Sequence, residues 1–356
     1  MTNPAPPSNR VRELRTASEL TQAELAERAG ISRTAVTAIE GERLVPSVAA
    51  ALALAKALGT TVEVLFGQGD KVDRPATWAW EPRTTLRQYW QAEVGGQHWL
   101  YPAESAPMLT PLPDGQWQSE SSVGSASSVT QTLVVACCDP AAGLLASEYA
   151  HATGWRMLIL HRSSRQALEL LKEGKVHLAG LHLSTADDTE RNAQVVRETL
   201  GSGYQLLRVA QWQEGITTVS SSRIKSIQGS ARLRLRWVGR EPGSGARQCL
   251  DHLLGDRSAP RRLARNHRGV AEAVSSGWAD AGICVQLTSA EAGLMFLPVQ
   301  EEAYDLCIPN AFHDDPRVQA LLKVVRSPNY RQILANLPGY STTQTGNLMG
   351  VDDALV

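Results

Sequence analysis

The sequence lacks the features that define several large classes of proteins. No stretch reaches the roughly 18 consecutive apolar residues that a membrane-spanning helix needs, and the first residues, MTNPAPPSNR, contain no apolar run typical of a secretion signal. The five cysteines include no CxxC pair, so they indicate neither a disulfide framework nor a zinc ribbon. A net charge of -1 excludes a polycation. We therefore expect a cytoplasmic protein that has no membrane partner.

Motifs of the common enzyme classes are also missing. Ser244 lies between Gly243 and Gly245, but Pro242 and Ala246 do not complete the GxSxG motif of hydrolases. The sequence contains no HExxH metal motif and no P-loop. We therefore expect no catalytic residues, no metal, no cofactor and no enzymatic activity.

Two short helices joined by a tight turn are predicted between Thr21 and Glu42. Apolar residues recur there at helical spacing, with one break and a change of register at Ala29-Gly30. Thr21 is followed three residues later by Glu24, which is the capping-box pattern of a helix start. Glycine at position 30 suits the left-handed turn that ends a helix. Two such helices form the helix-turn-helix that reads DNA, in which the second helix enters the major groove.

Residues from about 11 to 66 resemble the lambda-repressor-like (XRE) helix-turn-helix family. Ile39-Glu40-Gly41 is similar to the closing signature of that family, and Gln22 stands where the family places a phosphate-contacting glutamine. A helical hairpin used only for packing is the alternative. Residues 1–67 carry seven Lys/Arg against seven Asp/Glu, so a single head should bind DNA weakly and we expect a dimer on a two-fold operator. The expected DNA-contacting residues are Gln22, Ser32, Arg33, Thr34, Thr37, Ala38 and Arg43.

The composition changes after this head. Residues 72–117 hold five of the nine tryptophans and have turn signals at Gly95-Gly96, which predicts a small β-rich unit of three or four strands. We expect this unit to be a spacer or a dimerisation element. The Ser-rich residues 118–130 are predicted to be a flexible linker, with the head itself spanning 10–67. The remaining ends, residues 1–9 and 347–356, are predicted to be tails.

From residue 131 onward, short apolar runs alternate with helical stretches. A strand at Leu133–Ala136 is followed by a helix at Ala142–Thr153, and similar pairs recur along the chain. Such alternation implies a parallel sheet with crossover helices. Residues 131–346 are therefore predicted to form a two-lobed α/β domain, with the chain crossing between lobes near 204–212 and 297–303. The whole chain is predicted to be multidomain, with an all-α head, a small β-rich unit and this α/β domain.

Several strand ends in the α/β part carry polar residues suited to an anion. Ligands of open α/β sheets bind at the carboxyl ends of strands, near helix N-termini. The loop 239–247, GREPGSGAR, combines three glycines with two arginines, and arginine can hold an oxyanion at two points. Segment 223–268 has twelve Lys/Arg against three Asp/Glu, although a solvated basic face or a DNA-contacting surface would explain that excess too. For some of the candidates a helix cap, a turn residue or a core side chain is the alternative to a ligand contact. The expected ligand-binding residues are Asp139, Ser163, Ser164, His182, Arg240, Ser244, Gly245, Arg247, His267, Asp280 and Tyr304.

Residues from about 133 to 346 resemble the periplasmic-binding-protein-like domains that occur fused to helix-turn-helix heads and are often described as molybdate-binding-like. The resemblance is carried by motifs that include CDPAAGLL (138–145), GREPGSGAR (239–247) and NHRGVAEAVSSGWADAGI (266–283). It implies a type 2 binding fold that holds a small anion, with a molybdate-like oxyanion among the candidates.

These observations together predict a one-component transcription regulator. A homodimer would bind double-stranded operator DNA, and a small anionic effector would bind between the lobes and modulate that binding. The alternative is a nucleic-acid-binding regulator whose two-lobed domain has no small ligand. In that case the domain would serve oligomerisation, or its basic segment would contact DNA directly.

Overall fold

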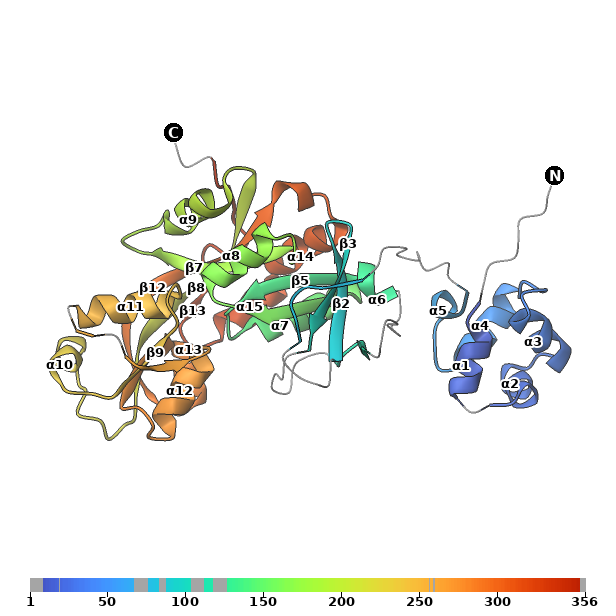
Figure 1. Cartoon of the computed structure of the whole chain (residues 1–356), viewed down its shortest axis with the longest axis horizontal. Coiled ribbons are helices and arrows are strands. Elements are labelled where there is room, and N and C mark those ends of the chain that lie inside the picture. The colour runs from blue at the N-terminus through green and yellow to red at the C-terminus, as the bar shows by residue number, and fades with distance from the viewer. Residues whose placement is uncertain are drawn as a thin grey trace. The chain divides into compact units, whose positions relative to one another are not determined.

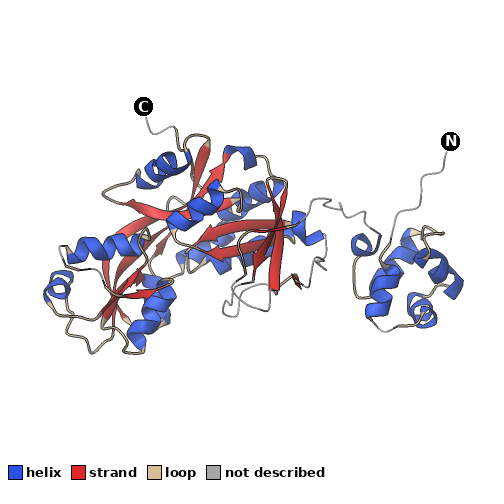
Figure 2. Ribbon diagram, viewed as in Figure 1, coloured by secondary structure: helices blue, strands red, loops and turns tan. Residues whose placement is uncertain are grey.

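The structure of the chain is a computed structural model that divides into two compact units (Figures 1 and 2). The first contains Met1–Pro75 with Gly124–Thr130, and the second contains Ala76–Val123 with Gln131–Val356. Most of the predicted N-terminal tail and most of the predicted linker lie outside the described residues. The residues that the structure describes are 9–18, 20–66, 76–82, 88–103, 112–117, 127–255, 257–258 and 260–352.

The helical head begins and ends its helices where local capping predicts. Thr21 Oγ1 accepts a hydrogen bond from the Glu24 amide at 3.2 Å, and Glu24 Oε2 accepts one from the Thr21 amide at 2.7 Å. Gly30 adopts φ 65°, which a glycine tolerates without strain. The predicted helix-turn-helix is therefore confirmed as α2, turn and α3. The helices of this unit are α1 (Val11–Ala17), α2 (Gln22–Ala29), α3 (Arg33–Glu40), α4 (Val48–Ala57) and α5 (Val62–Phe66), and the described part of the predicted linker adds α6 (Ser127–Thr130).

The tryptophan-rich region forms a four-stranded sheet within its described residues. The strand order is β1-β3-β2-β4, and β2 and β3 are joined by Gly95 and Gly96, whose φ angles of 58° and 76° suit a two-residue hairpin turn. The strands are β1 (Thr77–Trp78), β2 (Gln88–Val94), β3 (Gln97–Pro102) and β4 (Gly115–Gln116).

This small sheet packs on the α/β domain and does not stand apart from it as a spacer. Trp90 and Ala92 share a buried core with Leu158 of the α/β domain. Arg156 forms an ion pair with Asp114 at 2.6 Å. These side chains are buried or nearly so, and apolar burial of this kind fixes the sheet to the domain. The β-rich region that was predicted to be a spacer or a dimerisation element is thus part of the same compact unit as the two lobes.

The α/β domain is built on a ten-stranded mixed sheet in the described part of the chain. The order is β10-β9-β11-β8-β12-β7-β5-β6, with β13 and β14 paired to β8. The strands are β5 (Thr132–Cys137), β6 (Arg156–His161), β7 (Leu178–Thr185), β8 (Tyr204–Thr218), β9 (Trp237–Arg240), β10 (Arg262–Ala264), β11 (Ala281–Val285), β12 (Met295–Pro309), β13 (Tyr340–Ser341) and β14 (Leu348–Gly350).

Two long strands run through both lobes, as Figure 1 shows. β8 and β12 are 15 residues each and pair antiparallel over most of their length. We call residues 131–203 with 310–352 the first lobe and residues 219–294 the second lobe. The helices are α7 (Ala142–Thr153), α8 (Ser164–Lys172), α9 (Arg191–Leu200), α14 (Pro316–Arg326) and α15 (Pro328–Ala335) in the first lobe, and α10 (Ile227–Arg232), α11 (Gly245–Leu254), α12 (His267–Ser275) and α13 (Gln286–Glu291) in the second.

The predicted two-lobed fold is confirmed, but the sheet is mixed and not parallel as predicted, because β12 pairs antiparallel with both β7 and β8, and β11 pairs antiparallel with β8. The predicted lobe crossings are parts of β8 and β12. The predicted tail begins later than residue 347, because β14 pairs with β8 and Val351 is fully buried. Three residues of pairing and one buried apolar side chain were too weak a pattern to reveal this closing strand.

Candidate functional site

The amino-terminal half of α3 is the exposed face of the helix-turn-helix. Arg33 and Thr34 are exposed there, while Thr37 and Ala38 are half-buried one turn later. Ser32 caps the helix, since its hydroxyl accepts a hydrogen bond from the Ala35 amide at 3.1 Å. The predicted DNA-contacting residue Arg43 is also exposed. This arrangement leaves the first turn of α3 free to approach a DNA groove.

Gln22 ties the two motif helices together. Its Nε2 donates to Glu40 Oε2 at 2.8 Å, and its Oε1 accepts from Thr37 Oγ1 at 3.1 Å. Glu40 also pairs with Arg15 at 2.6 Å. Burial alone would raise the pKa of Glu40, but Arg15 and Gln22 hold that pKa below its usual value. The glutamine that resembles a phosphate contact therefore also fixes the angle between α2 and α3.

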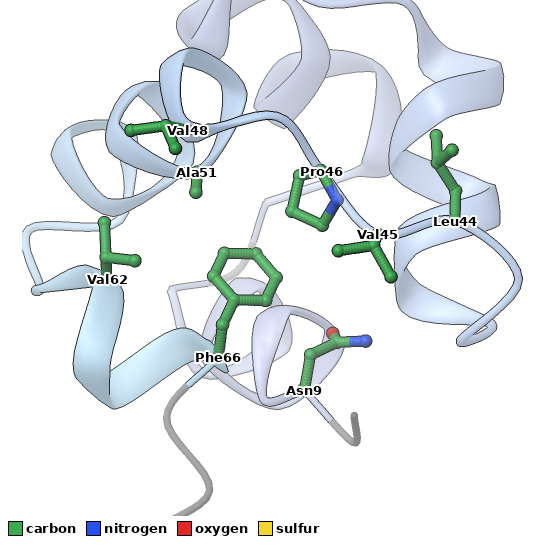
Figure 3. A pocket seen from close by; sticks show the side chains of 8 residues that line it. All are labelled: Asn9, Leu44, Val45, Pro46, Val48, Ala51, Val62 and Phe66. Carbon is green, nitrogen blue, oxygen red and sulfur yellow. The ribbon is translucent and has the colours of Figure 1, made fainter. Parts of the chain in front are cut away.

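An apolar pocket of about 220 Å³ opens on another face of the head (Figure 3). The side chains around it come from the segment before α1, from the loop before α4, from α4 itself and from α5. Several apolar side chains of this region are exposed, with Val45 at 61% and Val48 at 78%. The lining residues are Asn9, Leu44, Val45, Pro46, Val48, Ala51, Val62 and Phe66.

In the α/β domain, a buried polar cluster lies between the lobes and is centred on His182. The first lobe supplies Cys138 after β5 and His182 from β7, and the second lobe supplies His267 from α12. Cys138 Sγ lies 2.9 Å from His182 Nε2, and the rings of His182 and His267 are 5.7 Å apart. All three side chains are buried. A ligand would therefore enter this cluster only when the lobes part.

Residues of β8 and β12, the two strands that cross between the lobes, contact the other ring nitrogen of His182. His182 Nδ1 lies 2.7 Å from Glu302 Oε2, which also accepts a hydrogen bond from Trp212 Nε1 at 3.1 Å. Glu302 Oε1 accepts from Gln300 Nε2 at 2.8 Å. Both oxygens of this carboxylate are thus occupied, and Glu302 fixes the orientation of the His182 ring.

Three helix N-termini meet around His182. Ser164, the first residue of α8, accepts a hydrogen bond from the His182 amide at 3.4 Å. Gly245 opens α11 so close to His182 that a Cβ there would lie 2.7 Å from its Nδ1. His267 opens α12. Helix N-termini carry partial positive charge and free amides, so their convergence favours a bound anion.

Several buried polar atoms in this cluster have no hydrogen-bond partner among the described residues. They include Ser163 Oγ, Arg240 Nη1, Asp139 Oδ2 and both ring nitrogens of His267. Arg240 is paired with Glu241 at 3.0 Å through its other nitrogens. Buried polar groups are hydrogen-bonded in the large majority of cases, so this concentration of open donors and acceptors indicates a ligand site.

Burial and mutual charge shift the acid–base properties of the cluster. Burial alone would lower the pKa of His182, but Cys138 and Glu302 hold that pKa well above its usual value. Burial, with Glu302 beside it, raises the pKa of Glu214 well above that of an ordinary carboxyl. Burial, with Arg240 and His182 nearby, keeps the pKa of His267 well below its usual value. Burial and charge therefore favour the protonated, charged form of His182 and the neutral forms of Glu214 and His267.

The predicted ligand-binding residues divide into two groups. The first group is buried around the cluster and consists of Asp139, Ser163, Ser164, His182, Arg240, Ser244, Gly245 and His267. Ser244 Oγ caps α11, because it accepts a hydrogen bond from the Arg247 amide at 3.3 Å. Asp139 Oδ1 accepts a hydrogen bond from Tyr340 Oη at 2.7 Å.

Three predicted residues lie elsewhere. Arg247 pairs with Asp251 on its own helix at 2.8 Å, and its Nη1 donates to the carbonyl oxygen of Arg240 at 3.3 Å, so it contacts the backbone behind the cluster. Asp280 stands at the amino end of β11, where it pairs with Arg236 on the surface, because β11 runs parallel to β9 and only the carboxyl ends meet the cluster. Tyr304 is a core aromatic stacked on Trp212 at 4.9 Å.

Sequence analysis did not single out four residues that complete the cluster. Cys138, Trp212, Glu214 and Glu302 lie inside the motifs CDPAAGLL, WQEGI and EEAYDL. The available signal was an acidic residue inside an apolar strand, as at Glu214 between Trp212 and Ile216, because a carboxylate is rarely buried without a specific partner.

Comparison with known families accounts for both units. Residues 11–65 match the family described as helix-turn-helix, and residues 146–326, just over half of the chain, match the family described as PBP superfamily domain. Neither family is defined by a catalytic activity. None of the helices in the described residues has the length and apolarity that crossing a bilayer requires.

Individual relatives are more distant. The chain is 31% identical over 200 residues to YvgK, an uncharacterized protein of Bacillus subtilis (strain 168), in a match that covers 53% of this chain and 64% of that relative. A substrate-binding protein of a proposed phosphate ABC transporter from Clostridium perfringens, with bound phosphate, is similar in structure at a TM-score of 0.47 and 10% identity over 58% of this chain and 99% of its own. The structure of a tungstate ABC transporter from Geobacter sulfurreducens is similar at a TM-score of 0.44 and 13% identity, and the match covers 58% of this chain and 98% of that one.

Proposed function

Because this chain belongs to the PBP superfamily through residues 146–326 and carries a helix-turn-helix domain at residues 11–65, we propose that it is a cytoplasmic one-component transcription regulator. In this proposal the two-lobed domain binds a small anion between its lobes. A homodimer of the chain binds operator DNA through α3, and the anion modulates that binding.

The observation that carries the proposal is the set of open donors where three helix N-termini converge. Arg240 Nη1 and Ser163 Oγ are buried without partners among the described residues, and His267 lies beside them at the start of α12. Leaving such groups unpaired costs about 1–3 kcal/mol each. A small oxyanion, with molybdate as one candidate, has several acceptor oxygens that would satisfy these donors together.

Lobe closure supplies a route from anion to DNA. Donors come from both lobes: Ser163 precedes α8 in the first, and Arg240 ends β9 in the second. An anion bound to donors of both lobes would favour the closed arrangement. It shifts DNA binding only as far as its affinity for the closed arrangement differs from its affinity for the open one. The crossing strands β8 and β12 are the segments that such a motion would bend.

Dimerisation through the head is proposed on the basis of its exposed apolar pocket. Leu44, Val45 and Val48 are all exposed around that pocket, and contiguous exposed apolar surface is unusual for a protein that acts alone. A second copy of the head would cover it. Val48→Asp should therefore weaken self-association in sedimentation experiments; an unchanged monomer–dimer equilibrium would remove this surface from the proposal.

The alternative without a small ligand relies on the basic segment 223–268, and ion pairs account for part of that charge. Arg236, Arg240, Arg247 and Arg268 pair with Asp280, Glu241, Asp251 and Glu291. Paired arginines attract DNA phosphates less, so the segment is a weaker DNA-binding surface than its composition indicates.

Thermal unfolding of the full chain against molybdate, tungstate, sulfate and phosphate tests the proposal. An anion present at 100 times its dissociation constant should stabilise the two-lobed domain by about 2.7 kcal/mol. Arg240→Ala should abolish this shift, whereas Arg236→Ala, on a surface ion pair, should preserve it. Absence of a shift with every anion, together with stabilisation by DNA in an Arg33→Ala chain, would favour the alternative.

A further inference from the structure

We propose that Cys138, His182 and His267 form a binding site for a divalent transition-metal ion of the Zn²⁺ type. One ligand atom from each of these three buried side chains lies within 4.8 Å of the other two. Thiolate and imidazole are the ligands that Zn²⁺ prefers, and three protein ligands leave the fourth position of a tetrahedral ion open. Sequence analysis predicted no metal, because these residues are separated by 44 and 85 positions along the chain (182 minus 138, and 267 minus 182).

The distances suit an ion with only a small adjustment. Zn–S bonds of about 2.3 Å and Zn–N bonds of about 2.0–2.1 Å place the sulfur and nitrogen of a tetrahedral site about 3.5 Å apart. Cys138 Sγ and His182 Nε2 are 2.9 Å apart in the structure, so they would separate by roughly half an ångström. On binding, the ion replaces the proton that this pair shares, and that proton goes to solvent.

His267 is the residue of this site whose surroundings most clearly indicate a missing ligand. Its side chain is buried, and neither ring nitrogen has a hydrogen-bond partner among the described residues. Its ring lies 5.7 Å from that of His182, and one of its nitrogens lies within 4.8 Å of both Cys138 Sγ and a ring nitrogen of His182. A buried imidazole with both nitrogens open is unusual, and coordination of an ion by one of them would account for it.

A second layer of contacts already orients His182 as a metal ligand. Its Nδ1 bonds to Glu302 at 2.7 Å, which directs Nε2 toward Cys138. Glu302 is itself held by Trp212 and Gln300. A carboxylate that accepts the second N–H of a ligating histidine is the usual support of zinc sites, because it fixes the ring and increases its basicity.

A competing set of side chains is less suitable. His182, Glu214 and Glu302 also lie within 4.8 Å of one another. Both oxygens of Glu302, however, already accept hydrogen bonds from Trp212 and Gln300. Using this set would break those bonds, whereas the Cys138 set leaves them intact. The inferred ion also joins the lobes, since Cys138 and His182 lie in the first and His267 in the second.

Cobalt titration of the metal-stripped full chain tests this inference, which does not depend on an anion being the effector. One equivalent of Co²⁺ should produce the near-ultraviolet band of a cobalt–thiolate bond together with the visible bands of a tetrahedral site. Cys138→Ser should abolish the thiolate band, and His267→Asn should weaken metal affinity about tenfold or more. Glu302→Gln should weaken it about 10- to 100-fold while the band remains.

Cys137→Ser is the matched control. Cys137 is adjacent and equally buried, but it faces Gly180 and Tyr304 on the other side of β5, so its replacement should leave the band unchanged. Circular dichroism of each metal-free variant establishes that it is folded. A folded parent without the thiolate band, or a band that survives in Cys138→Ser, would overturn the inference. Should Cys138→Ser fail to fold, a band and affinity unchanged in His267→Asn would overturn it equally.

Discussion

The helical head and the two-lobed domain satisfy their polar side chains in opposite ways. In the head, Gln22 and Glu40 bond to each other and to neighbouring helices, and the caps at Thr21 and Ser32 are complete. In the cluster between the lobes, Ser163, Arg240 and His267 are buried and have polar atoms without a hydrogen-bond partner among the described residues. The head is therefore a finished folding unit that offers an exposed surface. The cleft has the unsatisfied interior expected of a site that is completed by its ligand.

The largest expected effect tests whether the head folds as its own unit. Leu25→Ala removes a fully buried side chain from the head core and should lower the free energy of unfolding of the head by about 2–5 kcal/mol. Calorimetry of the full chain should show one transition moving down while the transition of the two-lobed domain stays. Glu27→Ala, at an exposed side chain of α2 outside the proposed dimer surface, should change neither by more than about 0.5 kcal/mol.

The second prediction tests whether the buried carboxyl group of Asp139 makes the stability of the two-lobed domain depend on pH. Burial raises the pKa of Asp139 to about 6, above the value of about 3.9 in an unfolded chain. The folded protein holds this proton more tightly, so the free energy of unfolding should fall by roughly 2–3 kcal/mol as pH rises through that interval. Asp139→Asn should remove this part of the decline in the free energy of unfolding, as measured by urea unfolding between pH values of about 4 and about 6.

Asp280→Asn provides a contrast of opposite sign. Arg236 holds the pKa of Asp280 below its usual value, so the stability that this exposed carboxylate adds is present above the unfolded pKa and is lost as pH falls. If Asp139→Asn and its parent declined in parallel, the buried carboxyl would not be the group that titrates.

A third change tests how closely the lobes approach. Gly245→Ala would place a Cβ 2.7 Å from His182 Nδ1 and 2.8 Å from its carbonyl oxygen. Overpacking of this kind should cost about 1–3 kcal/mol of stability, and the anion response should weaken with it. Gly269→Ala, whose nearest contact is 3.4 Å, should be neutral. Equal melting temperatures for both variants and the parent would show that the lobes do not close as described.

The smallest expected change in free energy concerns the exposed surface of the head. Arg33→Ala should weaken operator binding by about 1 kcal/mol or more while leaving the anion response intact. Arg28→Ala, exposed on the preceding helix, is the control in an electrophoretic or fluorescence binding assay at one salt concentration. Equal operator affinity for Arg33→Ala and its parent would remove Arg33 from the DNA-contacting set.

Prediction from sequence was most accurate where structure is decided locally. The helix Ala142–Thr153 has the bounds that its pattern predicted. Caps, turn glycines and apolar spacing act within four residues, so they can be recognised without knowing the fold.

Prediction was weaker where contacts join distant segments. The tryptophan-rich sheet was expected to be a spacer or a dimerisation element, and the sequence did not reveal that Arg156 and Asp114 pair across 42 positions to fix it to the first lobe. Asp280 was expected among the ligand-binding residues, but strand direction places it at the amino end of β11, away from the cluster. Strand direction and side-chain partners follow from the topology of the sheet, which a motif does not contain.

The sequence by itself determined the DNA-reading head, the two-lobed architecture and the strand-end loops that carry Ser163, Arg240 and His267. Only the tertiary structure decided that Cys138 and Glu302 hold His182 between them. Local elements form from interactions between near neighbours in the chain, which their residue pattern records. A buried cluster depends on which strand ends meet, and that is fixed by sheet topology and by burial of the whole core.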